Sequence, residues 1–165
     1  MIDAVSGIGA AGALDTEVDS LDLDNTTSGN VDLAETDAVS IQQILQGADD
    51  SITVTAGGTI TVTSGGNGVV IDDTGDANGN GVITLTSTAG GVAVDAAVRN
   101  DSNGATANIV LDAQGTNSDV ALTALVIGSA LLSLSAFWTP IRNKVVAGLP
   151  NEWKARVPVA GVVAG

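Results

Sequence analysis

Short strand-like units recur along most of this 165-residue chain and constrain its fold more than any other feature. Each unit has the form apolar–polar–apolar, often with Thr at its centre, as in Ile52-Thr-Val54, Ile60-Thr-Val62 and Ile83-Thr-Leu85. This period-two alternation, rich in β-branched residues, is typical of a strand with one buried face. Clusters such as Gly-Gly, Gly-Asn and Asp-Asp separate the units and suit tight polar corners. Further units of this form are Leu21–Leu23, Val31–Leu33, Val39–Ile41, Val69–Ile71, Val92–Val94, Ile109–Leu111, Val120–Leu122 and Leu132–Leu134.

Two architectures use such units, a β-sandwich of hairpins and a parallel β-solenoid. A sandwich favours Asn-Gly turns and bulky aromatic residues between its sheets, whereas only 2% of this chain is aromatic. A solenoid stacks short strands so that aliphatic side chains form columns inside each coil. The units at Ile52, Ile83 and Ile109 begin 31 and 26 residues apart, and the next unit follows after a further 23. These steps suit coils of two or three strands, so we predict an all-β parallel β-solenoid, with the β-sandwich as the alternative.

The charge distribution divides the chain into two parts. Residues 1–136 contain 18 acidic residues and one base, Arg99, within a net charge of −14. Residues 137–165 contain four of the five bases, one acid, all three aromatic residues and all three prolines. We therefore predict a β-solenoid repeat domain over 1–136 and a basic, Pro- and Trp-containing tail or cap over 137–165. Such a segment either covers the exposed end of the stack or contacts an anionic surface such as the cytoplasmic membrane face.

The composition excludes several kinds of chemistry. The chain has no His, which removes the usual general base near neutral pH and the commonest metal ligand. It has no Cys either, so it forms no disulfide, thiol nucleophile or ordinary zinc site. The acidic body would repel phosphate groups, and we therefore expect no nucleic-acid partner. An acidic surface fits divalent cations or solubility outside the cell better.

A resemblance to a known class of protein is visible in three stretches. SGIGAAGALDTEVDSLDLDNTTSGNVDLAETDAVSI, SITVTAGGTITVTSGG and GVITLTSTAGGVAVDAAV resemble the repeats of long bacterial surface proteins with filamentous-haemagglutinin-like, adhesin-type repeats. The resemblance depends on three features: the Gly-Ile-Gly stretch at Gly7, the Leu-Asp-Thr step at Leu14 and the Asn-Thr-Thr-Ser-Gly-Asn link at Asn25. The resemblance covers residues 5–136. It implies a right-handed parallel β-helix on the cell surface and carries over no catalytic residues.

One glycine motif has the spacing of a dinucleotide-binding fingerprint. Gly7, Gly9 and Gly12 spell G-x-G-x-x-G, which binds pyrophosphate when a strand precedes it and a helix follows it. Only six residues precede this motif, and the residues after it are acidic where phosphate would bind. We therefore interpret it as a flexible repeat edge and expect no cofactor-binding residues.

A second motif has the spacing of a calcium loop. Oxygen-bearing side chains alternate through Asp76-x-Asn78-x-Asn80, and a Gly and a short strand follow. The twelfth position, where such a loop carries a bidentate Glu, is Ser87. Asn and Asp also stabilise tight corners without metal, because they bond their own backbone. We favour the corner and keep a weak, millimolar-class calcium site as the alternative, whose ligands would be Asp72, Asp73, Asp76, Asn78 and Asn80.

The segment 120–138 is uncharged and long enough to span a membrane, and Arg142 follows it on the side where a cytoplasmic flank would lie. It also divides into strand-like pieces: Val120–Leu122, Leu125–Ile127 and Leu132–Leu134. We predict that these pieces form closing coils, with membrane contact through 120–138 as the alternative. The inward side chains would then be Leu122, Ile127 and Leu134, and the outward ones would include Thr123 and Ser133.

These observations favour a non-catalytic structural or adhesive segment of an extracellular or cell-surface protein. The first residues lack the basic start and apolar run of a secretory signal. The chain therefore either stays in the cytoplasm or is a piece of a longer exported protein, and we favour the second. Its partner would be a surface ligand or matrix, and end-to-end self-association is a second expectation. The alternatives are a single-span membrane-anchored acidic ectodomain and a polysaccharide-active β-helix enzyme. The enzyme needs paired carboxylates and usually aromatic platforms, and no aromatic residue precedes Phe137.

Overall fold

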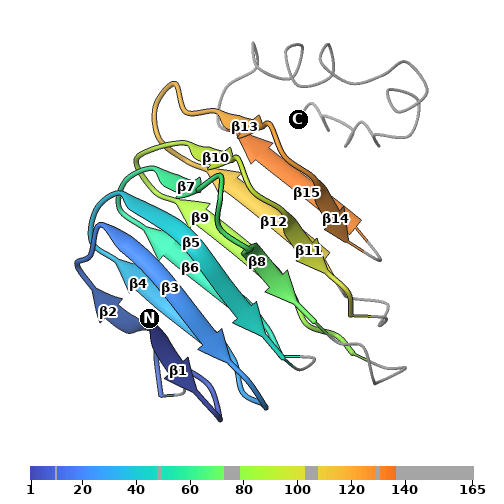
Figure 1. The fold of residues 1–165 in the computed structure, drawn as a ribbon. Coiled ribbons are helices and arrows are strands. Elements are labelled where there is room, and N and C mark those ends of the chain that lie inside the picture. Colours follow the sequence, from blue (N-terminus) through green and yellow to red (C-terminus); the bar gives the residue numbers. More distant parts are fainter. Residues whose placement is uncertain (10, 48–49, 73–78, 103–107, 129–130, 137–165) are drawn as a thin grey trace, which may run out of the picture.

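The computed structural model is an all-β parallel β-solenoid (Figure 1). It describes residues 1–9, 11–47, 50–72, 79–102, 108–128 and 131–136, and these contain no helix. The strands are β1 (Ile2–Ala4), β2 (Leu14–Thr16), β3 (Ser20–Asn25), β4 (Val31–Glu35), β5 (Val39–Gln46), β6 (Ile52–Ala56), β7 (Ile60–Val62), β8 (Gly68–Ile71), β9 (Ile83–Ser87), β10 (Val92–Val94), β11 (Val98–Asn100), β12 (Asn108–Ala113), β13 (Val120–Leu122), β14 (Val126–Gly128) and β15 (Leu131–Ala136).

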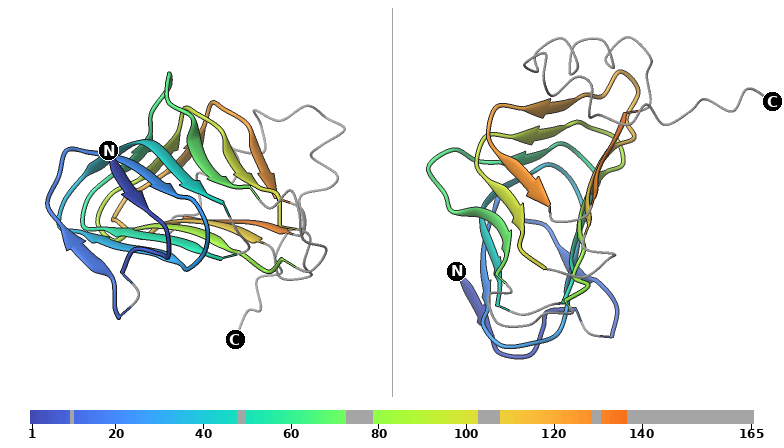
Figure 2. Two further views of the ribbon diagram at one scale, coloured as in Figure 1. Left: turned by 60° about the horizontal axis from the view of Figure 1, so that its bottom comes forward. Right: turned by 90° about the vertical axis from the view of Figure 1, so that its right-hand side faces the viewer.

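The strands form two sheets that face each other across one interior (Figure 2). One sheet has six strands in the order β15-β12-β9-β6-β4-β2, and the other has nine. The chain passes from the six-stranded sheet to the nine-stranded sheet and back in every turn. All pairings between the named strands are parallel. Hairpins would pair antiparallel, so the solenoid prediction is confirmed and the alternative sandwich is wrong.

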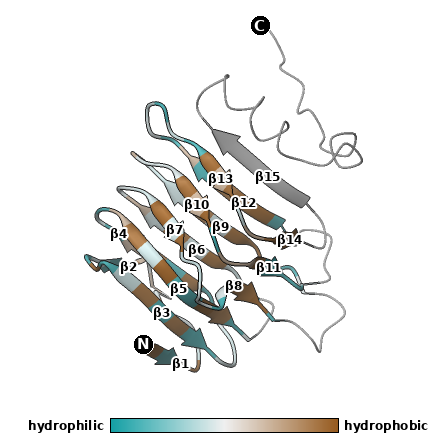
Figure 3. Ribbon diagram, turned by 45° about the horizontal axis from the view of Figure 1, so that its top comes forward, coloured by the Kyte–Doolittle hydropathy of each residue, from teal (hydrophilic) through white to brown (hydrophobic). Residues whose placement is uncertain are grey.

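The register of the six-stranded sheet aligns the starts of successive units. Ile52 pairs with Ile83, Ile83 with Ile109, and Ile109 with Leu132. The spacing of 31, 26 and 23 residues in the sequence is therefore the length of successive turns. Figure 3 shows the result as apolar strand segments that align from turn to turn, with polar residues in the corners. Aliphatic columns of this kind supply the apolar burial that stabilises the stack.

The nine-stranded sheet contains a bend that repeats from turn to turn. β5 is continuous, but β7 pairs with its first half and β8 with its second half. In the next turn the backbone N–H groups of Asp95 and Ala96 both donate to the Val62 carbonyl, at 2.8 and 3.1 Å. One turn later Thr123 and Ala124 donate in the same way to the Val94 carbonyl, at 2.9 and 3.1 Å. The break between β10 and β11 and the break between β13 and β14 therefore lie next to each other in successive turns.

The last described turn corrects one prediction about side-chain direction. Ile127, which we predicted to point inward, pairs with the exposed Arg99 and is itself 43% exposed. Its neighbour Val126 pairs with the fully buried Val98 and packs against the core. From the buried Val120 to residue 127, inward and outward side chains alternate without a break. Even-numbered residues therefore point inward, and Ile127 points outward.

The other expectations for this turn concern four residues. Leu122 packs against the core and Thr123 is exposed, as predicted. In the backbone register Leu134 pairs with Leu111, and Ser133 pairs with Val110. The segment 120–136 thus contributes β13, β14 and β15 to the stack. Among the residues that the structure describes, no helix is long and apolar enough to cross a membrane. The tail or cap predicted over 137–165 lies outside the described residues.

Candidate functional site

The polar side chains that the fold buries lie at the ends of strands or in the corners that follow them. Since desolvated polar groups need partners, their contacts show what each of them does. Within the described ranges the buried polar residues are Asn25, Glu35, Gln46, Ser87, Asn100, Ser102 and Ser118.

Asn25 and Gln46 stabilise the corner by which the chain leaves the nine-stranded sheet. The two residues are paired in register at the ends of β3 and β5. Asn25 Nδ2 donates to Gln46 Oε1 at 2.8 Å and to the Gly29 carbonyl at 2.6 Å. Gln46 Nε2 donates to the same carbonyl at 3.2 Å. Asn25 Oδ1 accepts from the Gly7 backbone N–H at 3.0 Å. Both amides therefore belong to the scaffold.

Glu35 has the same role in the opposite corner, at the end of β4. Its carboxylate accepts from the Thr16 hydroxyl at 2.6 Å and from the backbone N–H groups of Val18 and Thr36 at 3.2 and 3.0 Å. Charge-assisted bonds to N–H groups compensate a buried carboxylate for its lost hydration. Two turns along the stack Ser87 occupies the equivalent register position. Its hydroxyl donates to a corner carbonyl at 2.6 Å and accepts from a corner N–H at 2.9 Å.

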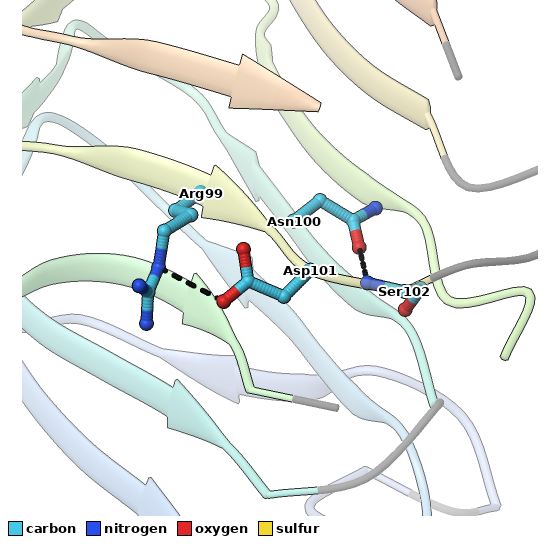
Figure 4. Close-up of polar contacts among 4 residues, drawn as sticks. All are labelled: Arg99, Asn100, Asp101 and Ser102. Carbon is cyan, nitrogen blue, oxygen red and sulfur yellow. Dashed lines mark hydrogen bonds and ion pairs between the residues drawn. The ribbon is translucent and has the colours of Figure 1, made fainter. Parts of the chain in front are cut away.

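Arg99 is the one base in the part of the chain that the structure describes, and it lies on the outer surface (Figure 4). Its Nε is 3.2 Å from Asp101 Oδ2, and the two side chains are 44% and 31% exposed. An exposed pair of this kind contributes about 0.2–1 kcal/mol. The neighbouring Asn100 points inward and is buried. Its Nδ2 donates to the Gly81 and Asn108 carbonyls at 2.8 and 3.1 Å, and its Oδ1 accepts from the Ser102 N–H. Asn100 therefore holds a corner of the stack through these bonds.

The predicted calcium ligands are only partly placed. Asp73, Asp76 and Asn78 lie outside the described residues. Asp72 is exposed at the end of β8, where its backbone N–H donates to the Gln46 carbonyl at 2.8 Å. Asn80 is exposed and has an interaction partner. Across the described ranges, no three carboxylates come together in a group that could hold a metal ion.

The Gly7–Gly12 motif serves a close backbone approach. Ile8 forms a parallel bridge with Val31 and is 8% exposed, so it closes part of the core beneath β4. Gly9 has a φ of +77°, and a Cβ there would lie 2.3 Å from the Asp32 carbonyl oxygen. Only glycine fits this position. Residues 7–9 are therefore paired with the neighbouring turn, whereas Ala10 lies outside the described residues, and the flexibility of this edge stays a prediction.

The candidate site is an array that we call the threonine face: Thr53, Thr55, Thr84 and Thr86 on the outside of β6 and β9. The two strands pair in register, so Thr53 adjoins Thr84 and Thr55 adjoins Thr86. All four side chains are half-buried and point away from the core. Neighbouring strands lie about 4.8 Å apart and alternate residues about 6.6 Å apart along a strand. The array is thus a regular rectangle of hydroxyl and methyl groups.

The surroundings of the threonine face extend it along the same two columns. Asp32 and Ala34 adjoin it on β4, and Val110 and Asp112 adjoin it on β12. Within the described residues the four threonine hydroxyls form no hydrogen bond to another protein atom. These hydroxyls are therefore left to solvent or to a ligand, unlike the buried polar groups of the corners.

Sequence reasoning missed this face, although it contained the signal. The fragments Ile52-Thr-Val-Thr-Ala56 and Ile83-Thr-Leu-Thr-Ser87 both place Thr at the two outward positions. The register shows which residues of these neighbouring fragments pair, and therefore that their threonines form one array. Comparisons with models of known families, with curated proteins and with solved structures found no match to this chain.

Proposed function

We propose that the chain is a non-catalytic structural and adhesive segment of an extracellular surface protein, with the threonine face as its contact surface. The observation that carries this proposal is the regular array of hydroxyls on the outside of the stack, which have no hydrogen-bond partner among the described residues. A repetitive surface suits a repetitive ligand, and two adjacent turns present the same pair of threonines at a fixed spacing.

The resemblance of residues 5–136 to adhesin-type repeats supports the same function. So does the net charge of −14, which keeps an exposed rod soluble and disfavours polyanionic partners. A neutral, hydroxyl-bearing polymer is the class of ligand that fits. Its hydroxyls can both donate to and accept from threonine hydroxyls.

A polysaccharide-active enzyme is supported less well. Such an enzyme needs two carboxylates that flank the substrate and act on it. Among the described residues the buried carboxylate is that of Glu35, and its two oxygens accept hydrogen bonds from Thr16, Val18 and Thr36 in a corner. Its role is therefore to stabilise the backbone of two adjacent turns.

The location is tested on intact cells that make the protein from its natural gene. Antibodies raised against the purified chain should label these cells without permeabilisation, and added protease should remove the label. Labelling that requires permeabilised cells would contradict the proposed location. This experiment does not depend on the nature of the ligand.

The contact surface is tested with beads that carry the purified protein. We expect these beads to adhere to dextran-coated surfaces and to adhere less to dextran sulfate, which the acidic body repels. The quadruple Thr→Val variant at 53, 55, 84 and 86 removes the hydroxyls but keeps β-branched side chains, and it should lose adhesion. The matched control is Thr61→Val, on the outer side of β7 in the other sheet. Equal adhesion of the quadruple variant and the control would refute the assignment of the face.

A further inference from the structure

The core is incompletely closed at the C-terminal end of the described stack. Along one column Val62 and Val94 are fully buried, whereas Leu122 above them is only partly buried. Along a second column Val98 is fully buried and Val126 is partly buried. The inward side chains Leu122 and Val126 of the last described turn therefore retain exposed apolar surface, whereas their register partners in the two preceding turns are buried.

The backbone at the same end has one free edge on each sheet. Within the described residues β13, β14 and β15 each pair with one neighbouring strand, on the side of the preceding turn. Unpaired N–H and C=O groups on an edge favour a further strand or a covering segment. Leu125 and Ile127, which are 62% and 43% exposed, add apolar surface beside this edge.

We propose that residues 137–165 of the same chain cover this end of the solenoid. This segment begins directly after β15, so it starts at the edge in question. Its 29 residues can extend over roughly 100 Å, several times the length of a six-residue strand such as β15. The reach is therefore sufficient to cross the end of both sheets.

The chemistry of the segment matches the surface. It contains Phe137, Trp138, Trp153 and several valines, which suit partly exposed apolar side chains. It also contains four bases and one acid, opposite in sign to the body of residues 1–136. Asp119, exposed in the last described turn, is one carboxylate on that body. Apolar contact supplies the affinity, and the opposite charges favour this surface for docking.

A second copy of the chain is the competing occupant of this end. Two bodies of like charge repel each other, and a segment attached to β15 has a high effective concentration at its own end. Both considerations favour the covering segment of the same chain.

Tryptophan fluorescence tests the proposal without any labelling, because both Trp residues lie in 137–165. In the native full-length protein we expect acrylamide to quench this fluorescence at least about two-fold less than in the urea-unfolded protein, since docked indole rings are shielded. The protection should not change on dilution. The fluorescence and far-UV circular dichroism transitions in urea should coincide.

A pair of variants locates the contact. Leu122→Gln, at the C-terminal end, should increase the quenching toward the unfolded value. Leu14→Gln, at the opposite end of the stack and 41% exposed, should leave it unchanged. Native quenching equal to the unfolded value would overturn the proposal, and so would equal effects of the two variants. Protection that disappears on dilution would assign the end to a second copy and would overturn the proposal too. The measurements on the unsubstituted protein remain decisive if a variant fails to fold.

Discussion

Truncating Ile83 to Ala should strongly destabilise the middle of the solenoid. Ile83 is fully buried, and its register partners Ile52 and Ile109 are fully buried as well. Ile→Ala substitutions in cores cost about 2–5 kcal/mol, and the cost rises with the cavity that remains. The neighbouring rungs are held by parallel backbone pairing on both sides of β9, so they cannot collapse into the space. We therefore expect a loss of about 4 kcal/mol.

The adjacent outward residue provides the matched control. Thr84 lies on the same strand but points away from the core. Thr84→Ala removes little buried surface and should cost less than about 1 kcal/mol. The two variants differ by one position, so the comparison reports which face of β9 is buried.

Urea unfolding followed by far-UV circular dichroism measures both losses. A domain of this size has a total stability of about 5–15 kcal/mol, so Ile83→Ala should shift the midpoint clearly. In a stacked repeat, a weak central interface can also separate the unfolding of the two ends, which would broaden the transition. Equal losses for the two variants, or a larger loss for Thr84→Ala, would refute the assignment of the buried face.

Three further outcomes are expected at the corners. Glu35→Ala should reduce the stability by about 1–3 kcal/mol in the same urea assay, because corner N–H groups lose their acceptor; an unchanged midpoint would contradict this role. Gly57→Ala should destabilise by about 2 kcal/mol, because its Cβ would lie 2.0 Å from the Thr36 carbonyl oxygen; a gain in stability, the usual result at an unstrained glycine, would show that this approach is absent. Calorimetry should detect weak calcium binding or none, with a stability change below about 1 kcal/mol for Asp76→Ala; a micromolar site that this substitution abolishes would restore the metal interpretation.

The repeat unit predicted the architecture because it determines both the strand period and the turn length. The spacing from Ile52 to Ile83 and Ile109 became the register of the six-stranded sheet. Alternation alone does not align the outward residues of one unit with those of the next, since the three steps differ in length. That information came from the pairing, and the threonine face came with it.

Two kinds of feature could not be predicted from the pattern. Ile127 was predicted to point inward together with Leu122, but the two are five residues apart, and an odd separation places them on opposite faces of the alternating strand. The roles of Asn25 and Glu35 depend on backbone N–H groups of an adjacent turn, at sequence separations of 18 and 17 residues. Short-range motifs contain no signal for such contacts. The same limit applies to the glycines near Ile8, whose role depends on the neighbouring turn.

Disulfide cross-linking tests the central claim, the parallel in-register stack, most directly, because the chain has no cysteine of its own. The Thr53→Cys/Thr84→Cys variant places two thiols on adjacent strands about 4.8 Å apart, within the span of a disulfide. The offset pair Thr53→Cys/Thr86→Cys would be about 8 Å apart, beyond that span. A hairpin between residues 52–56 and 60–62 would instead join Thr55→Cys to Thr61→Cys, which the solenoid places on different sheets. After mild oxidation of dilute protein, mass spectrometry should find the 53–84 bridge and neither of the others. A 55–61 bridge without the 53–84 bridge would contradict the solenoid.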